Sequence, residues 1–373
     1  MRVRVLPLFV LLLAGLATAA AEGQRAAKRS GGGFLLSTGE RLSLSKSGTL
    51  RIRQGRAEAS LPLPRDVAEL VGVDEGPVPG AIGLKLGRAC PPDRSLALTH
   101  EDLEARLLVA RTRGRGQTML AALRKAVVLA PNQADLRLKL LRGLLAAGQA
   151  QEAKRILSEG LRVTPFEVAW LAGQDKEVAR LVTEASAARP PVDLGCRGAE
   201  PSPASAAWSS ARRMAAFVDH AWNLRVVAAG NAEVFTGELG LGRELDESGR
   251  VLPAATKAVA ARVAAAEAML GLLGFRTLPT SQRISAERND DLSWVRWKER
   301  GVVASAGNHV IRVRQGGKVV FEDKIDTTGT IGLDWGLPLP EEGLLLLAWS
   351  RIVGSDTCPN DSGISQVPLP GPR

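Results

Sequence analysis

Three stretches near the middle of the chain repeat a pattern that favours short paired helices. Gly-Gln dipeptides at positions 116, 148 and 173 each open an apolar-periodic run that closes at a proline 15, 17 and 17 residues after the glycine. The second and third runs, AGQAQEAKRILSEGLRVTP and AGQDKEVARLVTEASAARP, align without a gap and share seven residues in register. Self-similarity of this kind is typical of stacked helical repeats, in which each unit buries its apolar face only against its neighbours.

The stretch from Pro131 to Pro165 spans 34 residues and resembles the tetratricopeptide repeat. The residues that match the roles of that family are Gly148 in the turn, Ala153 and Gly160 in the second helix, and the closing Pro165. Arg137 departs from the pattern, since the family usually has an aromatic residue there. The resemblance covers about residues 99–190, with one good repeat and two degenerate neighbours, and implies an interaction scaffold of antiparallel helix pairs.

The rest of the chain divides by composition into further segments. With 373 residues, of which 45% are hydrophobic and 24% charged, the chain is long enough for two or three folded domains. The predicted order is a signal peptide (1–21), a flexible leader (22–33), a small β unit with an irregular segment (34–98), helical repeats (99–190), a linker (191–207), a helical hairpin (208–280), a β-sandwich-like domain (283–353) and a loose tail (354–373). The predicted fold class is therefore α+β.

The helical hairpin is predicted from apolar spacing. Trp208, Ala211, Ala215, Val218 and Trp222 step by three or four residues, as one stripe of a helix does. A second apolar stripe runs along residues 254–273, and a Gly-rich stretch joins the two.

Both flanks carry strand signals. Apolar residues alternate with polar ones in GERLSLSKSGTLRIRQGRAEASLP, which resembles part of a FecR-type β domain. Towards the other end, Gly316-Gly317 is suited to a tight hairpin turn between two alternating runs. That region resembles an edge of an immunoglobulin-like or fibronectin type III-like sandwich.

The first 21 residues read as an export signal. Arg2 and Arg4 precede an apolar stretch from Val5 to Leu16, and small residues follow in Ala17-Thr18-Ala19 or Ala19-Ala20-Ala21. The apolar stretch is shorter than the ~20 residues that span a bilayer. The predicted location is periplasmic or secreted, with no stable membrane span after signal removal, and the segment order resembles exported bacterial envelope proteins.

The predicted export would place the three cysteines in an oxidising compartment, where disulfides form. With Cys90, Cys196 and Cys358, an odd count predicts one disulfide and one free thiol. We expect the Cys196–Cys358 pairing, with no disulfide as the main alternative, because the two prolines after Cys90 stiffen its approach. The spacing of the three histidines predicts no metal site.

Composition and motifs argue against several functions. The formal charge is +10, but Tyr is absent and aromatic residues are only 4%, so the stacking platforms of a nucleic-acid binder are missing. No common hydrolase, protease or nucleotide-binding signature occurs, which predicts a protein without catalytic residues or cofactor.

Two hypotheses for function follow. The first is a non-enzymatic scaffold that binds envelope proteins or peptides through its helical repeats and its β domain. The alternative is a carbohydrate- or peptidoglycan-binding module in the terminal β domain, with Trp294, Trp297, Arg296 and Arg312 as ligand contacts. Trp294 and Trp297 are three apart on one expected strand, so they point to opposite faces and only one of them is expected at the surface.

Overall fold

A computed structural model describes most of the chain as two compact units, residues 1–163 and 164–373. The described residues are 25–30, 33–45, 48–63, 67–76, 80–88, 94–187, 189–196, 206–219, 222–228, 232–240, 244–246, 250–289, 292–325, 330–352 and 362–369. The predicted signal peptide lies outside them. The mixture of helices and antiparallel sheets confirms the α+β class.

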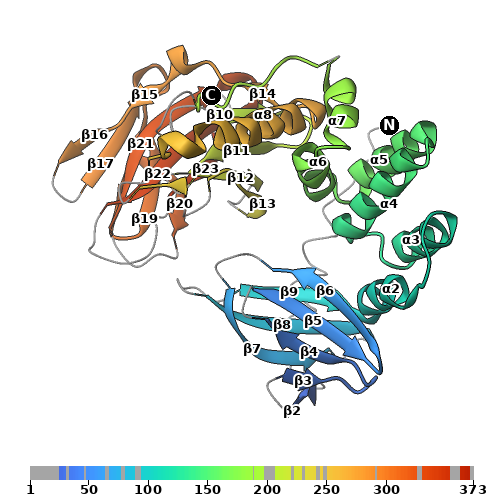
Figure 1. Cartoon of the computed structure of the whole chain (residues 1–373). Coiled ribbons are helices and arrows are strands. Elements are labelled where there is room, and N and C mark those ends of the chain that lie inside the picture. The colour runs from blue at the N-terminus through green and yellow to red at the C-terminus, as the bar shows by residue number, and fades with distance from the viewer. Residues whose placement is uncertain are drawn as a thin grey trace, which may run out of the picture. The chain divides into compact units, whose positions relative to one another are not determined.

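The first unit begins with two antiparallel sheets that share one core (Figure 1, blue). One sheet has the order β1-β7-β8-β9, with β1 Arg25–Ala26, β7 Val67–Glu75, β8 Ala81–Arg88 and β9 Arg94–Thr99. The other has the order β2-β3-β4-β5-β6, with β2 Lys28–Ser30, β3 Gly33–Leu35, β4 Arg41–Leu44, β5 Thr49–Gln54 and β6 Ala57–Pro62. Leu42 and Ile52 of the second sheet and Leu84 of the first are fully buried in the core between them.

Two predictions for this region are wrong. The predicted flexible leader 22–33 contains strands β1 and β2, one in each sheet. The segment expected to be irregular after Pro62 forms β7, β8 and β9. Its prolines led to the wrong prediction because they suit loops, yet the stretches between them are long enough for strands of six to nine residues.

Helices follow where the repeats are predicted. They are α2 (His100–Arg111), α3 (Gln117–Leu129), α4 (Ala134–Ala146), α5 (Ala150–Val163), α6 (Pro165–Gln174) and α7 (Ala179–Ser186). The cap expected at Thr99 is present, because its side chain and that of Asp102 each bond the other residue's backbone N–H. Prolines follow α3 and α7 and start α6, as predicted.

The turn between α4 and α5 is the one that the sequence predicts best. Gly148 has φ +73°, its N–H donates to Leu145, and the next N–H, of Gln149, donates to Leu144. This pair of bonds is a Schellman motif, which ends a helix at a residue in the left-handed region. Gly173 differs, since it lies inside α6 rather than in a turn. α6 and α7 belong to the second unit, where they pack on α8.

One of the two helices predicted for the helical hairpin 208–280 is present and the other is wrong. Its second helix exists as α8 (Thr256–Leu272), but its first helix is replaced by strands. The strands are β10 (Ala206–Ser209), β11 (Met214–Val218), β12 (Asn223–Ala228), β13 (Glu233–Glu238) and β14 (Arg276–Thr277), in the order β13-β12-β11-β10-β14. The chain reverses between β10 and β11, so Trp208 and Ala215 of the supposed stripe are cross-strand neighbours rather than successive turns of a helix.

Two further sheets share one core in the region where a β-sandwich-like domain is predicted. The sheet β15-β21-β22-β23 contains β15 (Ile284–Ser285), β21 (Thr330–Leu339), β22 (Leu344–Ile352) and β23 (Ser362–Pro368). The sheet β16-β17-β18-β19-β20 contains β16 (Glu287–Asn289), β17 (Leu292–Trp297), β18 (Val302–Gly307), β19 (Val310–Gln315) and β20 (Lys318–Lys324). Gly316 and Gly317 form the predicted hairpin turn with positive φ.

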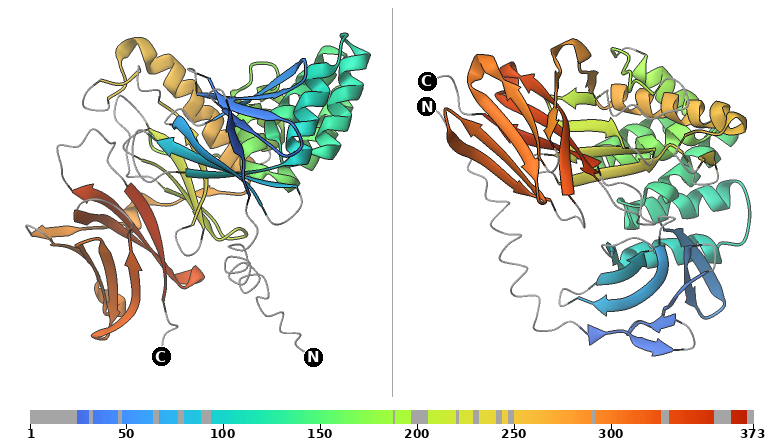
Figure 2. Two further views of the ribbon diagram at one scale, coloured as in Figure 1. Left: turned by 90° about the horizontal axis from the view of Figure 1, so that it is seen from below. Right: turned by 90° about the vertical axis from the view of Figure 1, so that its left-hand side faces the viewer.

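The β15–β23 sheet is buried on both faces. Leu345 and Leu347 of β22 face the core shared with β17–β19, whereas Leu344 and Leu346 face a second core shared with β10–β12. The run of four leucines is therefore a strand whose alternate side chains enter two different cores. The sheets of this unit lie one against the next, with α8 on the outer face of the β10–β13 sheet (Figures 1 and 2).

Two further boundary predictions are wrong. The tail 354–373 is not uniformly loose, because β23 pairs with β22 along its length and is buried. The linker 191–207 is partly anchored: Leu194 is fully buried and its N–H donates to Glu267 of α8 at 2.9 Å. Of the described helices, none is long and apolar enough to cross a membrane.

Candidate functional site

An apolar groove lies between α2, α3 and α4 in the first unit. It has a volume of about 610 Å³. Its apolar lining comes from Val109 of α2, from Met119, Leu120 and Leu123 of α3, and from Gly143 and Ala146 of α4 with the following residue, Ala147. A concave, mostly apolar surface of this size is the usual form of a binding site.

Small residues on α4 shape this groove. A β-carbon at Gly143 would lie 2.7 Å from Cδ2 of Leu120, so a larger residue there would require the end of the Leu120 side chain to move. Ala146 and Ala147 then end α4 without large side chains and leave the groove open.

Two cations lie at the rim of the groove. Lys139 and Arg142 line it from α4, and both are exposed. Val109 and Lys139 also line a second hollow, of about 400 Å³, which is completed by Glu58, Ser60 and Arg106. The two hollows therefore adjoin along α4, and Lys139 stands between them.

Arg106 fixes the wall of the second hollow. Its side chain is buried, and its two terminal nitrogens reach the carboxylate of Asp135 at 2.6 and 2.7 Å. One of them also donates to the backbone oxygen of Ser60 in β6 at 3.2 Å, and the other contacts Gln133. A bidentate pair of this kind is geometrically demanding, so it holds α2, α4 and the sheet edge in one arrangement.

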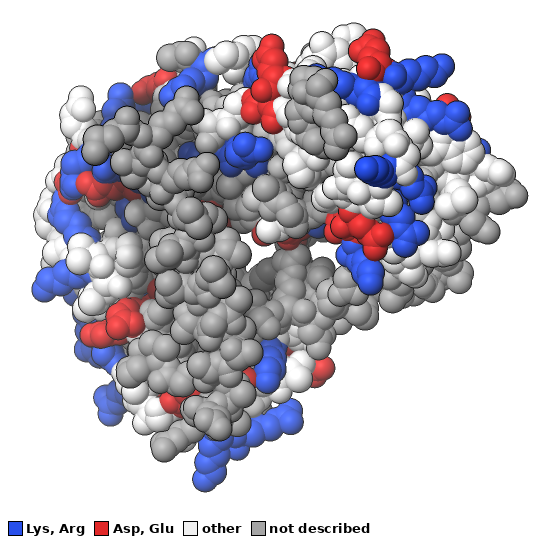
Figure 3. Space-filling view, turned by 180° about the vertical axis from the view of Figure 1, so that it is seen from behind, with Lys and Arg blue, Asp and Glu red and all other residues white. Residues whose placement is uncertain are grey.

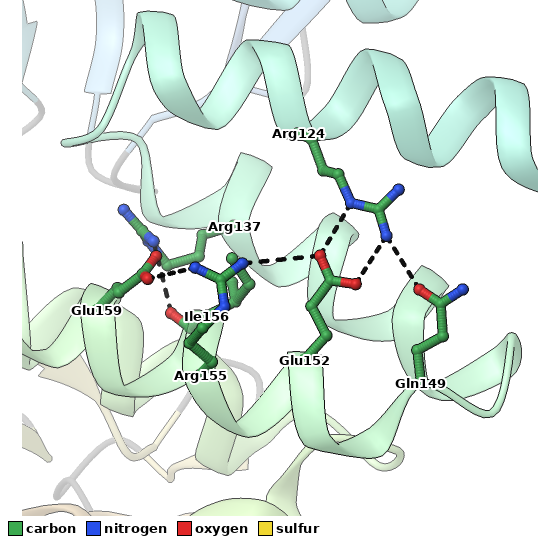
Figure 4. Close-up of polar contacts among 7 residues, drawn as sticks. All are labelled: Arg124, Arg137, Gln149, Glu152, Arg155, Ile156 and Glu159. Atoms are coloured by element: carbon green, nitrogen blue, oxygen red, sulfur yellow. Dashed lines mark hydrogen bonds and ion pairs between the residues drawn. The ribbon is translucent and has the colours of Figure 1, made fainter.

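A second polar cluster joins α3 to α5 (Figure 4). The guanidinium of Arg124 donates to Glu152 at 2.9 and 2.8 Å and to Gln149 at 2.9 Å. The hydrogen bond from Arg124 lowers the pKa of the Glu152 carboxyl below its ordinary value. Arg155 also pairs with Glu159, at 2.5 Å, on the same helix.

Arg137 lies buried between α4 and α5, beside this cluster (Figure 4). It donates to the backbone oxygens of Pro131 at 3.1 Å and Ile156 at 3.5 Å, while its Nε has no partner. Burial lowers the pKa of this guanidinium, although the negative charge of Glu159 opposes that shift. The residue that departs from the repeat pattern is thus a structural residue of the helix pair.

The ligand contacts predicted on the terminal sandwich separate onto two faces. Trp297 is 8% exposed and belongs to the core between the sheets, so it cannot contact a ligand. Trp294 is half-buried on the outer face, as expected for one of the two, and its Nε1 donates to Glu287 at 2.5 Å. The guanidinium of Arg296 lies 5.6 Å above the Trp294 ring, so this cation covers one face of the indole.

Arg312 lies on the same outer face, two strands from Trp294. Its Nε donates to Glu322 at 2.7 Å, and that bond lowers the pKa of the Glu322 carboxyl. Residues of five strands stand in one cross-strand row: Glu287, Trp294, Ser305, Arg312 and Glu322. The structure therefore brings Trp294, Arg296 and Arg312 to one surface, where each is engaged by a neighbouring side chain.

Of the three cysteines, Cys196 lies among the described residues. Cys196 is half-buried and its thiol donates to the backbone oxygen of Leu194 at 3.6 Å, whereas Cys358 and Cys90 lie outside the described residues. The Cys196–Cys358 pairing stays a prediction. Within the described part of the chain, no group of three or more His, Cys, Asp or Glu side chains is placed to hold a metal ion.

Charges of both signs are interspersed on the face shown in Figure 3, where Lys and Arg side chains alternate with Asp and Glu. Comparisons with protein-family models, with curated proteins and with solved structures give no match.

The sequence analysis did not predict the groove. Its lining residues come from three helices and are ordinary apolar types, each consistent with a packed core. One signal was present: Gly143, Ala146 and Ala147 leave the end of α4 without large side chains, and Lys139 and Arg142 stand beside them.

Proposed function

We propose that this protein is an exported, non-enzymatic interaction protein that binds a segment of another envelope protein in the α2–α4 groove. The observation that carries the proposal is an open apolar groove of about 610 Å³ at the surface of a helical array. A concave and mostly apolar surface of this volume is the usual form of a ligand site. The tetratricopeptide resemblance supports the same proposal, because helical repeats present surfaces of this sort.

The framework around the groove also supports binding rather than catalysis. Two buried arginines, Arg106 in the adjoining hollow and Arg137 between α4 and α5, are bound to a carboxylate or to backbone oxygens, and these contacts hold the helices in place. Such a rigid arrangement limits the conformational cost of binding a partner.

The proposal is tested with a charged residue placed in the groove. Met119→Glu changes a half-buried lining residue in the first turn of α3, where a carboxylate suits the helix dipole. Gln117→Glu adds the same charge two residues away, outside the groove lining, and is the matched control. Wild type and both variants are used to capture envelope proteins, which are then identified by mass spectrometry. We expect at least one envelope protein to be captured by wild type and by Gln117→Glu but not by Met119→Glu. Equal capture by all three proteins would contradict the proposal.

The second candidate function is glycan binding on the outer face of the β16–β20 sheet. It is favoured by the half-exposed indole of Trp294 beside two arginines, which is a surface that a sugar ring can stack on. It requires Arg296 to leave the face of the indole. Sedimentation with purified cell-wall material, compared between wild type and Trp294→Ala, tests it, and equal sedimentation of the two removes this candidate.

A further inference from the structure

We propose that the occupant of the α2–α4 groove is an amphipathic helical segment whose polar edge is acidic, and that Lys139 selects it. This inference rests on the proposed function and adds the chemistry of the partner.

The shape of the groove favours a row of apolar side chains. The floor is made by α3 and the end of α4, and Gly143 and Ala146 leave it without large protruding side chains. A partner helix presents apolar residues at positions i, i+3, i+4 and i+7 on one side, and helix-in-groove recognition uses these as anchors. Met119 is suited to line such a site because its unbranched side chain adapts to different partners.

The positive charges at the rim of the groove indicate which charge the partner needs along its polar edge. Lys139 and Arg142 are one helical turn apart on α4 and both are exposed. Among the described residues that line the groove none is acidic, and no described residue forms an ion pair with Lys139. In the adjoining hollow the carboxylate of Glu58 is already engaged by Arg53 at 2.6 Å. A carboxylate on the partner would therefore supply the missing complement to Lys139.

Other anionic occupants fit the groove less well. Of the described residues in its lining, none is aromatic, so bases of a nucleic acid have nothing to stack on. A lipid headgroup would match the cations but would leave the apolar floor to be filled by an acyl chain. These two occupants are outcomes of the test below.

The test uses three fluorescent peptides of about 18 residues, roughly five helical turns, with the same leucine face. Their flanking residues are Glu, Gln or Lys, and binding is followed by fluorescence anisotropy with the full chain. We expect the Glu peptide to bind on the order of tenfold more tightly than the Gln peptide, the Lys peptide to bind more weakly still, and the difference to shrink in high salt. Lys139→Glu leaves Arg142 as the only cation among the described lining residues, so it should remove most of the preference for the Glu peptide over the Lys peptide.

Lys125→Glu is the matched control, since Lys125 is an exposed lysine of α3 that lines neither hollow. It should leave the order unchanged, and circular dichroism confirms that both variants fold.

The outcomes separate this inference from the proposed function. In one outcome the Glu and Gln peptides bind with equal affinity, and their binding is unaffected by Lys139→Glu but abolished by Met119→Glu. This result would overturn the inference that the partner has an acidic edge, but would leave the groove as an interaction site. Binding of no peptide would overturn both. A third outcome is that no peptide binds, but phosphatidylglycerol vesicles or a single-stranded oligonucleotide bind to wild type and not to Lys139→Glu. This result would overturn the inference and the proposed function, and would identify a lipid or a nucleic acid as the ligand of the groove.

Discussion

Trp349 and Gly363 are cross-strand partners on β22 and β23, and the indole of Trp349 lies directly over the bare α-carbon of Gly363. A β-carbon on Gly363 would overlap the ring. An aromatic side chain that covers a glycine on the neighbouring strand stabilises the pair and fixes its register. This contact stabilises the pairing of β23 with β22 in the β15–β23 sheet.

The first prediction is that Gly363→Ala destabilises the second unit by about 2 kcal/mol, because overpacking forces the ring or the strand to move. All seven tryptophans of the chain lie in residues 170–349, so their fluorescence reports on unfolding of the second unit alone. Gly271→Ala is the control: it lies in α8, has ordinary space for a methyl group and should be neutral or stabilising. Equal denaturation midpoints for Gly363→Ala and wild type would contradict the contact.

A second prediction concerns the turn at Gly148. Nothing lies within 4 Å of a β-carbon built there, so the cost of substitution comes only from the positive φ of +73°. We expect Gly148→Ala to lower the free energy of unfolding by about 1 kcal/mol and Gly148→Val by about 2 kcal/mol. Gly148→Asn should cost less than either, since Asn tolerates this conformation. Circular dichroism at the helix band measures the effect, and an equal loss for Asn and Val would show that crowding, not φ, governs the site.

Arg137 provides a third prediction. It is a buried cation with two backbone acceptors and an unpartnered Nε, so its desolvation is only partly offset. Arg137→Met keeps the volume without the charge and should change stability by less than about 1 kcal/mol in either direction. Arg137→Ala leaves a cavity and should cost about 3 kcal/mol. Thermal unfolding followed at the helix band distinguishes them, and equal losses in both variants would mean that the charge itself is required.

The pH dependence of the α3–α5 contact gives a fourth prediction. The pKa of Glu152 is held below its ordinary value by the hydrogen bond from Arg124, so the folded state binds this proton less readily than the unfolded chain. The stabilisation is therefore present above the unfolded pKa and is lost as the pH falls through the folded pKa. Wild type should be more stable than Glu152→Gln near pH 7, and the two should converge on acidification.

Denaturant titrations followed by circular dichroism, at about pH 7 and about pH 3.5, measure this difference. Glu184→Gln, at an exposed i,i+4 pair with Arg180 on α7, is the control and should show a much smaller change. A gap between wild type and Glu152→Gln that stayed constant with pH would remove the assigned role of Arg124.

Local signals in the sequence predicted those parts of the fold that local physics determines. The Thr99 cap, the Gly148 turn and the Gly316-Gly317 hairpin depend on a few adjacent residues, and all three occur as expected. The β10–β13 sheet was missed because alanines and tryptophans at intervals of three and four fit a helix as well as two short strands. Only pairing with distant residues, such as Trp208 with Arg276, distinguishes the two.

The two candidate sites also differ in how far local sequence patterns predict them. The opposite orientations of Trp294 and Trp297 follow from the period of a strand and could be predicted. The groove and its rim depend on how α2, α3 and α4 pack, and no local pattern indicates that Lys139 stands between two hollows.

The central position of the β21–β23 sheet has a consequence for the order in which the second unit assembles. Strands β10–β13 and β16–β20 come earlier in the chain, yet among the described residues each of these sheets has an apolar face that packs mainly against β21, β22 and β23. Until those three strands pair, both faces are exposed to water and to each other, which is the situation in which nascent β-proteins aggregate. If the chain is exported as we propose, it folds only after it has crossed a membrane, and we then expect its yield in the periplasm to depend strongly on chaperones there.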